Sequence, residues 1–462
     1  MSQRLYEKLA KLNSDGLYPF HMPGHKRNID ASNMKSPFEE LLKGAYEIDI
    51  TEIDGFDNLH DAKELILDAE KNAARLYKSS ETHFLVNGST SGILTAISSV
   101  CNRGDKIIVA RNCHISVYNA IEINGLEPVY VYPEIVGKST VNAGIAGSIR
   151  KEAVEKLVLS NLDAKAIVVT SPTYDGVLSD IAGISRVAHE YDIPLIVDEA
   201  HGALFFKEGR SAVDCGADIV INSLHKTLPA LTMTALIHVN GNIVDRNRIK
   251  KYLRIYQTSS PSYILMASID YAMAVMEEEG NRLYREFCIR LTKLKAALIK
   301  LNSLVYINRD MLVGDGAFDF DESKILISTS GLNLSGKDLY DILVEKYKLQ
   351  PEMAAGDYVL LMTTLFDSDE GIEKLISALN EIDKDILNKK IVKRETDNQL
   401  KNIEDTEKLD CFKASKEKPS TNTVYAYPPG IPIIVSGEII TDEHIQEIEK
   451  AVNDRLDIKW VD

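Results

Sequence analysis

The chain has 462 residues, more than one ordinary hydrophobic core accommodates, so two or three domains are expected. Its 45% hydrophobic and 26% charged residues exclude a wholly disordered chain, and its net charge of −16 argues against nucleic acid or an anionic membrane as the main partner. Apolar runs stay far below the roughly 20 residues of a membrane helix, and the first residues lack the apolar core of a signal peptide. The five cysteines follow no pattern, so we expect a reduced, cytoplasmic protein without disulfides.

From about residue 61 to residue 239, short apolar runs rich in β-branched residues alternate with amphipathic stretches. Buried strands that alternate with helices predict an α/β fold with a mostly parallel sheet, in which ligands bind at the carboxyl ends of the strands. The predicted strands are Thr82–Val86, Lys106–Ala110, Glu127–Tyr132, Lys165–Thr170, Pro194–Val197, Asp218–Asn222 and Met233–Val239. The predicted helices are Asp61–Tyr77, Ser91–Cys101, Ile115–Ile123, Arg150–Ser160 and Ile181–Tyr191.

Beyond this region the pattern changes to two long helices and then to a second, α+β unit. The predicted helices are Ser262–Glu279, Asn281–Lys300, Gly336–Tyr347, Glu370–Asp385 and Asp442–Arg455, and the predicted strands are Lys324–Ser328 and Tyr358–Met362. The polar stretch Asn388–Glu407 is expected to form a helix or a hinge. We therefore expect an N-terminal segment (residues 1–60), a large domain (61–300), a small α+β domain (301–387) and a C-terminal extension (388–462).

Two residues at the ends of predicted strands could carry covalent chemistry. Lys226 ends the sequence Ser-Leu-His-Lys that follows the strand Asp218–Asn222, and Asp198 ends the preceding apolar run, 28 residues earlier (226 − 198). That offset allows one helical crossover, so both side chains would reach one crevice. A desolvated lysine can form a Schiff base, and a carboxylate paired with a pyridinium nitrogen beside such a lysine is typical of pyridoxal phosphate sites. Taken singly, Lys226 is more simply a solvated loop residue and Asp198 a helix cap.

Two further segments follow predicted strands. The sequence NGSTSG (Asn87–Gly92) offers backbone N–H groups and hydroxyls to a phosphate at a helix start, although an ordinary helix cap is the simpler alternative. It lacks the Walker lysine and the G-x-G-x-x-G spacing, which disfavours nucleotide binding. His114 could stack on an aromatic ring at the same sheet edge, or could be a structural histidine.

Two other kinds of site are disfavoured. His21 and His25 have the spacing of a helical metal pair, but Pro23 and Gly24 lie between them and no cysteine or carboxylate cluster completes a site. A Ser/His/Asp hydrolase is disfavoured because no G-x-S-x-G elbow is present. We therefore expect no bound metal.

Taken together, the motifs resemble those of the fold-type-I pyridoxal-phosphate enzymes, and within them the bacterial Orn/Lys/Arg decarboxylases. The matching blocks, in family order, are HMPGHK (His21–Lys26), DGFDNLH (Asp54–His60), NGSTSG (Asn87–Gly92), SPTYDG (Ser171–Gly176), VDEAHG (Val197–Gly202), SLHK (Ser223–Lys226), QTSSPSY (Gln257–Tyr263) and YPPGIP (Tyr427–Pro432). VDEAHG with SLHK indicates a pyridoxal enzyme, and HMPGHK with YPPGIP indicates the decarboxylase branch. The resemblance implies an aspartate-aminotransferase-like large domain with a mostly parallel seven-stranded sheet.

The resemblance also implies roles for individual residues. Lys226 would form the Schiff base with pyridoxal 5'-phosphate, Asp198 would pair with its pyridine nitrogen, His114 would stack on its ring, and His201 would lie near its phenolic oxygen. Either Lys226 or His201 would return the proton to the substrate carbon. The remaining cofactor-binding residues that it implies are Gly88, Ser89, Thr90, Ser223 and His225, with Thr258 and Ser259 as weaker candidates that reach a neighbouring subunit's site.

Because HMPGHK begins at residue 21, we expect the short form of the family, without the N-terminal wing domain, as a dimer or tetramer with shared sites. The implied reaction is decarboxylation of a basic amino acid, arginine to agmatine first, then lysine to cadaverine or ornithine to putrescine, in polyamine synthesis. No acidic residue can be chosen as the partner of the substrate's distal cation. Two alternatives stay open: another fold-type-I enzyme, such as an aminotransferase or side-chain lyase, and a non-catalytic regulatory protein.

Overall fold

The computed structural model describes residues 18–20, 52, 56–136, 145–388, 403–427, 430–453 and 456–461, with the backbone alone at residues 19, 403–407 and 453. The motif His21–Lys26 lies outside the described residues, as do Pro428 and Pro429 of the block Tyr427–Pro432. Most of the expected N-terminal segment, residues 1–60, and residues 389–402 of the polar stretch also lie outside them.

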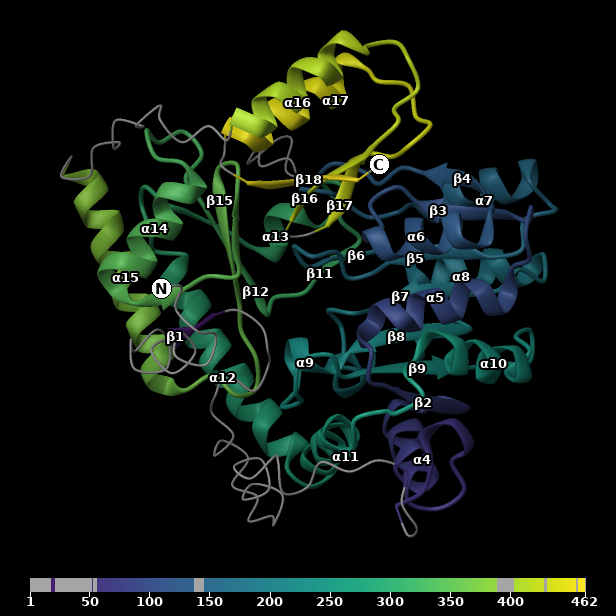
Figure 1. Cartoon of the computed structure of the whole chain (residues 1–462). Coiled ribbons are helices and arrows are strands. Elements are labelled where there is room, and N and C mark those ends of the chain that lie inside the picture. The colour runs from purple at the N-terminus through teal and green to yellow at the C-terminus, as the bar shows by residue number, and fades with distance from the viewer. Residues whose placement is uncertain are drawn as a thin grey trace, which may run out of the picture.

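Seven strands form the largest sheet, in the order β2-β9-β8-β7-β5-β3-β4 (Figure 1). Its strands are β2 (Glu81–Leu85), β3 (Lys106–Ala110), β4 (Glu127–Val131), β5 (Ile167–Thr170), β7 (Leu195–Asp198), β8 (Ile219–Ser223) and β9 (Ala235–Val239). Strand β9 pairs antiparallel with both of its neighbours, and the other pairings are parallel. The prediction of a mostly parallel seven-stranded sheet is therefore confirmed, and each predicted strand is present within two residues of its expected ends.

Helices connect and cover these strands (Figure 1). They are α4 (Leu65–Tyr77), α5 (Gly88–Val100), α6 (Ile115–Asn124), α7 (Lys151–Ser160), α8 (Ile181–Glu190), α9 (Leu224–Thr227), α10 (Arg246–Tyr256), α11 (Tyr263–Glu278) and α12 (Gly280–Leu298), with 3₁₀ turns η2 (Leu59–Asp61) and η3 (Phe205–Lys207). Side chains alternate across the sheet because successive strand residues point to opposite faces. Leu85 of β2 therefore packs in one core with α5, whereas Phe84 packs in another with α4 and α11.

The first predicted helix begins later than expected. The pattern predicts a helix from Asp61, but α4 begins at Leu65 and Asp61 ends the separate 3₁₀ turn. The cause is the Asp57 carboxylate, which accepts the backbone N–H groups of Glu64 and Ile66 at 2.9 and 3.0 Å. These bonds satisfy first-turn donors from outside the helix and so set its start.

A four-stranded antiparallel sheet, in the order β10-β12-β15-β14, forms the α+β unit. Its elements are β10 (Val305–Ile307), α13 (Arg309–Leu312), β12 (Lys324–Ser328), α14 (Gly336–Tyr347), β14 (Met353–Ala355), β15 (Tyr358–Met362) and α15 (Asp369–Leu387). The strand β1 (Tyr18–Pro19) pairs with β13 (Leu349–Gln350), and Phe20 is fully buried in the core of this unit. The short strand β11 (Asp319–Phe320) pairs antiparallel with β6 (Val177–Leu178), which lies between β5 and β7 in the sequence. This pairing connects the α+β unit to the unit that contains the large sheet.

The last unit is a three-stranded antiparallel sheet, in the order β17-β16-β18, with two helices and its own apolar core. Its elements are α16 (Ile403–Ala414), β16 (Thr423–Tyr427), β17 (Ile431–Ile434), α17 (Asp442–Asn453) and β18 (Asp457–Val461). Helix α16 begins inside the polar stretch Asn388–Glu407, so the helix alternative is correct for the described end of that stretch. The unit lies beside the β3 and β4 side of the large sheet (Figure 1).

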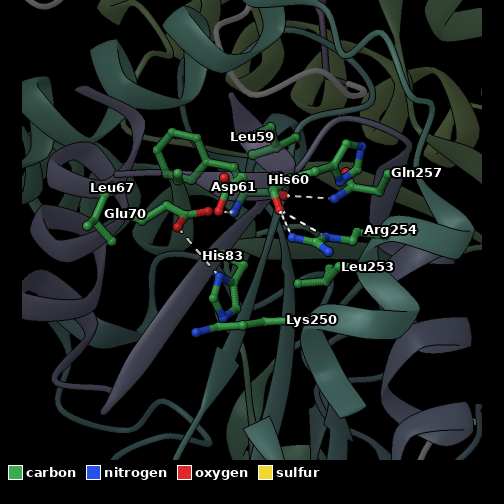
Figure 2. A pocket seen from close by; sticks show the side chains of 12 residues that line it. Leu59, His60, Asp61, Leu67, Glu70, His83, Lys250, Leu253, Arg254 and Gln257 are labelled. Atoms are coloured by element: carbon green, nitrogen blue, oxygen red, sulfur yellow. Dashed lines mark hydrogen bonds and ion pairs between the residues drawn. The ribbon is translucent and has the colours of Figure 1, made fainter. Parts of the chain in front are cut away.

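A small cavity of about 150 Å³ lies between α4, β2 and α10. Figure 2 shows His83 pointing toward Glu70, with 3.5 Å between His83 Nδ1 and Glu70 Oε2. Burial opposes the charge, but Glu70 and Glu81 raise the pKa of His83 to about 9. At neutral pH the protonated His83 therefore pairs with Glu70 and connects the edge strand β2 to α4, so these charges stabilise the fold.

Within the described part of the chain, no helix is both long and apolar enough to cross a membrane.

Candidate active site

Three predicted side chains meet at the carboxyl edge of the large sheet. Asp198 is the last residue of β7, and Lys226 lies in α9 directly after the parallel neighbour β8. His201 lies in the turn beyond Asp198, and its Nε2 is 2.8 Å from the Lys226 amine. Asp198 and His201 are buried, and Lys226 is half-buried at the wall of a cavity. The common crevice that the spacing of Asp198 and Lys226 predicts is present.

The Lys226 amine is poised for nucleophilic chemistry. Desolvation lowers its pKa to about 8, against the opposing attraction of the Asp198 and Glu352 carboxylates. The unprotonated fraction of the amine near neutral pH is therefore far larger than for an ordinary lysine, and that form is the nucleophile that attacks an aldehyde. Burial, followed by the charge of Lys226, lowers the pKa of His201 well below its ordinary value, so this ring is neutral.

Asp198 is a buried carboxylate with a backbone partner on one oxygen. Its Oδ1 accepts the N–H of Ala200 at 3.1 Å. Burial raises the pKa of Asp198, and the charge of Lys226 opposes that rise. A buried carboxylate at a cavity wall is costly unless a cation or a strong donor meets it, so this position suits a protonated ring nitrogen.

The start of α5 lines the same cavity. The helix begins at Gly88 rather than at the predicted Ser91, and Gly88 itself takes a φ of +75°, which glycine adopts without a steric penalty. Its N-cap residue, Asn87, makes no side-chain capping hydrogen bond, so the alternative of an ordinary side-chain cap is not observed. Ser89 and Thr90 lie in the first turn and line the cavity. Helix N–H groups and two hydroxyls here suit a phosphate.

His114 lies across the cavity at the start of α6. Its Nδ1 accepts the backbone N–H of Ser116 at 3.2 Å and lies 2.9 Å from the Ser116 hydroxyl. Burial and the charge of Lys226 lower the pKa of His114 to about 4, so the ring is neutral at physiological pH. A neutral, oriented imidazole can stack on a flat aromatic group.

The other predicted residues divide into two groups. His225 lines the cavity, and Ser223 is fully buried at the end of β8, where its hydroxyl has no hydrogen-bond partner among the described residues. Thr258 and Ser259 are exposed and do not line the cavity of their own chain. The Thr258 carbonyl lies 2.8 Å from Nε2 of His60, which belongs to another of the family blocks.

The cavity has a volume of about 450 Å³ and is lined by residues of the large-sheet unit and of the C-terminal unit. Residues that sequence reasoning did not assign to the site are Asn112, Ile115, Ser116, Thr170, Pro172, Tyr174, Ala200, Thr232, Met233, Tyr425, Tyr427 and Ile431. Tyr174 meets the His201 ring edge-on, with 4.7 Å between centroids, and donates its hydroxyl to Glu352. Two of these residues could have been predicted from the sequence, because Tyr174 lies in the block SPTYDG and Tyr427 in the block YPPGIP. Those blocks indicated the family but were not assigned to the site.

The residues present fit pyridoxal 5'-phosphate. They offer an amine for its aldehyde, a buried carboxylate for its ring nitrogen and a helix start for its phosphate. An orphaned polar atom supports the fit, because Nδ1 of His201, a residue that lines the cavity, is buried without a partner among the described residues. Buried polar atoms are rarely left unpaired in the functional state of a protein.

A seven-stranded, mostly parallel sheet with this lysine and aspartate at its carboxyl edge defines the class of fold-type-I pyridoxal-phosphate enzymes. Residues 3–327 match the family described as "Orn/Lys/Arg decarboxylase, major domain". The chain belongs to the Orn/Lys/Arg decarboxylases, which are pyridoxal-phosphate-dependent enzymes. The resemblance inferred from the motifs is therefore confirmed.

Individual relatives support this membership. An arginine decarboxylase of Bacillus subtilis is 32% identical over 98% of this chain and 94% of its own. The uncharacterized protein YaaO of the same organism is 36% identical over 98% of this chain and 95% of its own. The crystal structure of the Francisella novicida lysine decarboxylase LdcF has a TM-score of 0.73 at 19% identity, covering 99% of this chain and 82% of that one, which shows a shared fold.

Proposed function

We propose that this basic amino-acid decarboxylase acts on arginine and releases agmatine and CO₂. The observation that carries the choice of substrate is the similarity to the Bacillus subtilis arginine decarboxylase, which extends over nearly the full length of both chains. Related arginine decarboxylases of Bacillus anthracis and Bacillus cereus are 32% and 31% identical over 98% and 94% of this chain. Lysine and ornithine are the next candidates.

The proposed residue roles follow from the cavity. Pyridoxal phosphate, when bound, supplies an aldehyde that takes up amino groups and a ring that withdraws electrons from the substrate's α-carbon. Lys226 would hold it covalently, and Asp198 would keep its ring nitrogen protonated, an interaction that strengthens as negative charge develops. His114 would fix the plane of the ring. The proposed phosphate-binding residues are Gly88, Ser89, Thr90, Ser223 and His225.

Proton delivery is the other task of the protein. Decarboxylation breaks the bond between the α-carbon and the carboxylate, releases CO₂ and adds one proton to that carbon. The proposed carrier is Lys226 or His201, whose nitrogens lie 2.8 Å apart. The edge-on contact of Tyr174 holds the His201 ring in its orientation.

Turnover of arginine, lysine and ornithine by the cofactor-loaded protein tests the choice of substrate. We expect agmatine and CO₂ from arginine, with kcat/KM for the other two lower by about tenfold or more. Amines are identified by mass spectrometry, and 2-keto acids are assayed in parallel, with Lys226→Ala protein as the blank. Faster turnover of lysine or ornithine would overturn the choice of arginine. Keto acid without CO₂ would instead identify an aminotransferase, and bound cofactor without any turnover would identify a non-catalytic protein.

We also propose that the enzyme is a cytoplasmic homodimer with shared sites. The exposure of Thr258 and Ser259, away from their own chain's cavity, supports a role toward a neighbouring subunit. All five cysteines are free thiols, which suits a reducing compartment. Sedimentation over a dilution series should show a two-chain particle whose specific activity falls as it dissociates. A fully active monomer would contradict the shared site, and fractionation of expressing cells checks the location.

A further inference from the structure

The C-terminal unit forms a roof over the cavity, defined here as residues 425–427 and 430–438. Tyr425 and Tyr427 of β16 and Ile431 of β17 line the cavity, although they belong to the last of the three units (Figure 1). The carbonyl of Gly430 accepts the N–H of Ile115 at 2.9 Å, so the roof touches the segment that carries His114. The approach is close, since a Cβ at Gly430, whose φ is +82°, would lie 3.1 Å from His114 Nε2.

A single buried arginine joins this roof to the large sheet. Arg111 follows β3 directly and is 8% exposed. Its Nε and Nη2 donate to the two carboxylate oxygens of Glu438 at 3.0 and 2.8 Å. The remaining donors reach the carbonyls of Pro432 and Ile433, at 2.8 and 3.1 Å, and the Tyr118 hydroxyl at 3.1 Å. The guanidinium group therefore uses all five of its N–H donors, four of them on the roof.

No other residue type fits this position. A lysine carries the same charge but has neither the planar fork that matches a carboxylate in two places nor five donors. Burial opposes the charge of Arg111, but the neighbouring Tyr118 and Glu438 outweigh it and keep the pKa of Arg111 above its ordinary value. Glu438 also accepts the N–H of Val435 at 3.0 Å, so the ion pair fixes the turn at the end of the roof.

We propose that Arg111 is a positioning residue that, with Glu438, holds the roof over the active site and thereby sets the affinity for substrate. The proposed cofactor-binding residues come from the large sheet, whereas Tyr425, Tyr427 and Ile431 come from the roof. Loosening the roof should therefore weaken the binding of the amino acid while leaving the bound cofactor in place. The inference rests on the proposed function, because it requires that a basic amino acid binds in the cavity beneath the roof.

The test uses the cofactor-loaded full chain with Arg111→Lys, Glu438→Gln and both changes together. We expect KM for the best of the three basic amino acids to rise on the order of tenfold, with kcat changed less than about threefold and the visible cofactor band retained. Because the two residues act through one ion pair, the double variant should be no worse than the more impaired single variant. The control is Lys416→Gln, which removes an exposed ion pair with Asp442 within the same unit, at 2.6 Å, and should leave KM unchanged.

Hydrogen exchange gives a readout that does not depend on turnover. Backbone amides of residues 430–438 should exchange faster in Arg111→Lys and Glu438→Gln than in the wild type or in Lys416→Gln. An unchanged KM together with unchanged exchange in a folded variant would overturn the proposal. Faster exchange with an unchanged KM would overturn the link to substrate. If Arg111→Lys does not fold, Glu438→Gln decides by the same criteria. Because the exchange is measured without substrate, a wild type inactive on all three amino acids would count against the proposed function and not against the anchoring by Arg111.

Discussion

Replacing Lys226 by alanine should abolish the visible absorption band of the bound cofactor and reduce turnover by on the order of a thousandfold or more, about 4 kcal/mol of transition-state stabilisation. The reason is that Lys226 is the cavity's primary amine, and desolvation lowers its pKa to about 8, so it can attack an aldehyde. Borohydride reduction of the loaded wild type should attach the cofactor to the peptide that contains Lys226. Absorption spectra, peptide mass spectrometry and CO₂ release measure the three effects.

A second variant separates the chemistry of Lys226 from its charge. Lys226→Arg keeps a cation beside Asp198, but a guanidinium group stays protonated and cannot form the covalent bond, so we expect the same loss as with alanine. Lys78→Ala, which removes an exposed lysine paired with Asp214, should keep both the band and the turnover. Full turnover of Lys226→Ala, or labelling of a different lysine, would show that the nucleophile is assigned wrongly.

The large sheet could be predicted from the sequence because burial on both faces leaves a local pattern. All residues of β7 and β8 are buried, and each strand begins with three consecutive aliphatic residues, Leu195–Val197 in β7 and Ile219–Ile221 in β8, before its polar end. The meeting of Asp198 and Lys226 then followed from topology, because neighbouring parallel strands bring their carboxyl ends to one edge. The family blocks added the roles of His114 and His201, which local spacing alone left open.

The roof could not be predicted in the same way. In β16, buried residues alternate with partly or fully exposed ones, and β18 is a short segment with one buried residue, so neither strand stands out from its surroundings. Strand β16 pairs with β17 and β18, and the buried arginine that bonds to β17 lies far away in the sequence, so no local pattern encodes these contacts. Arg111 reads as an ordinary charged residue after a strand, and only the fold shows that its five donors all reach hydrogen-bond acceptors. The start of α4 was predicted wrongly for a related reason. The carboxylate that accepts its first N–H groups belongs to Asp57, seven residues before Glu64, so the pattern within the helix does not show where the helix begins.

Replacing Asp198 by asparagine should lower kcat by about a thousandfold while cofactor binding persists. The amide has nearly the same shape and can still accept the Ala200 N–H, but it carries no negative charge. The proposed pairing with a protonated ring nitrogen matters most when charge flows from the α-carbon toward the ring, so the loss should fall on kcat rather than on KM. Asp198→Ala should lose at least as much and retain some cofactor. Steady-state kinetics and cofactor titration measure the two effects.

The adjacent carboxyl group provides a matched control. Glu199 is also buried, but it bonds to Asn222 and to the N–H of Ala212, at 3.0 and 2.6 Å, and does not line the cavity. Burial raises the pKa of Glu199 to about 8, so this group is largely protonated at neutral pH. Glu199→Gln therefore replaces a neutral acid by a neutral amide and should keep kcat within about threefold. If Asp198→Asn were equally mild, the charge at position 198 would not assist catalysis. If Glu199→Gln were equally severe, the effect would belong to the buried turn as a whole rather than to a single carboxylate facing the cofactor.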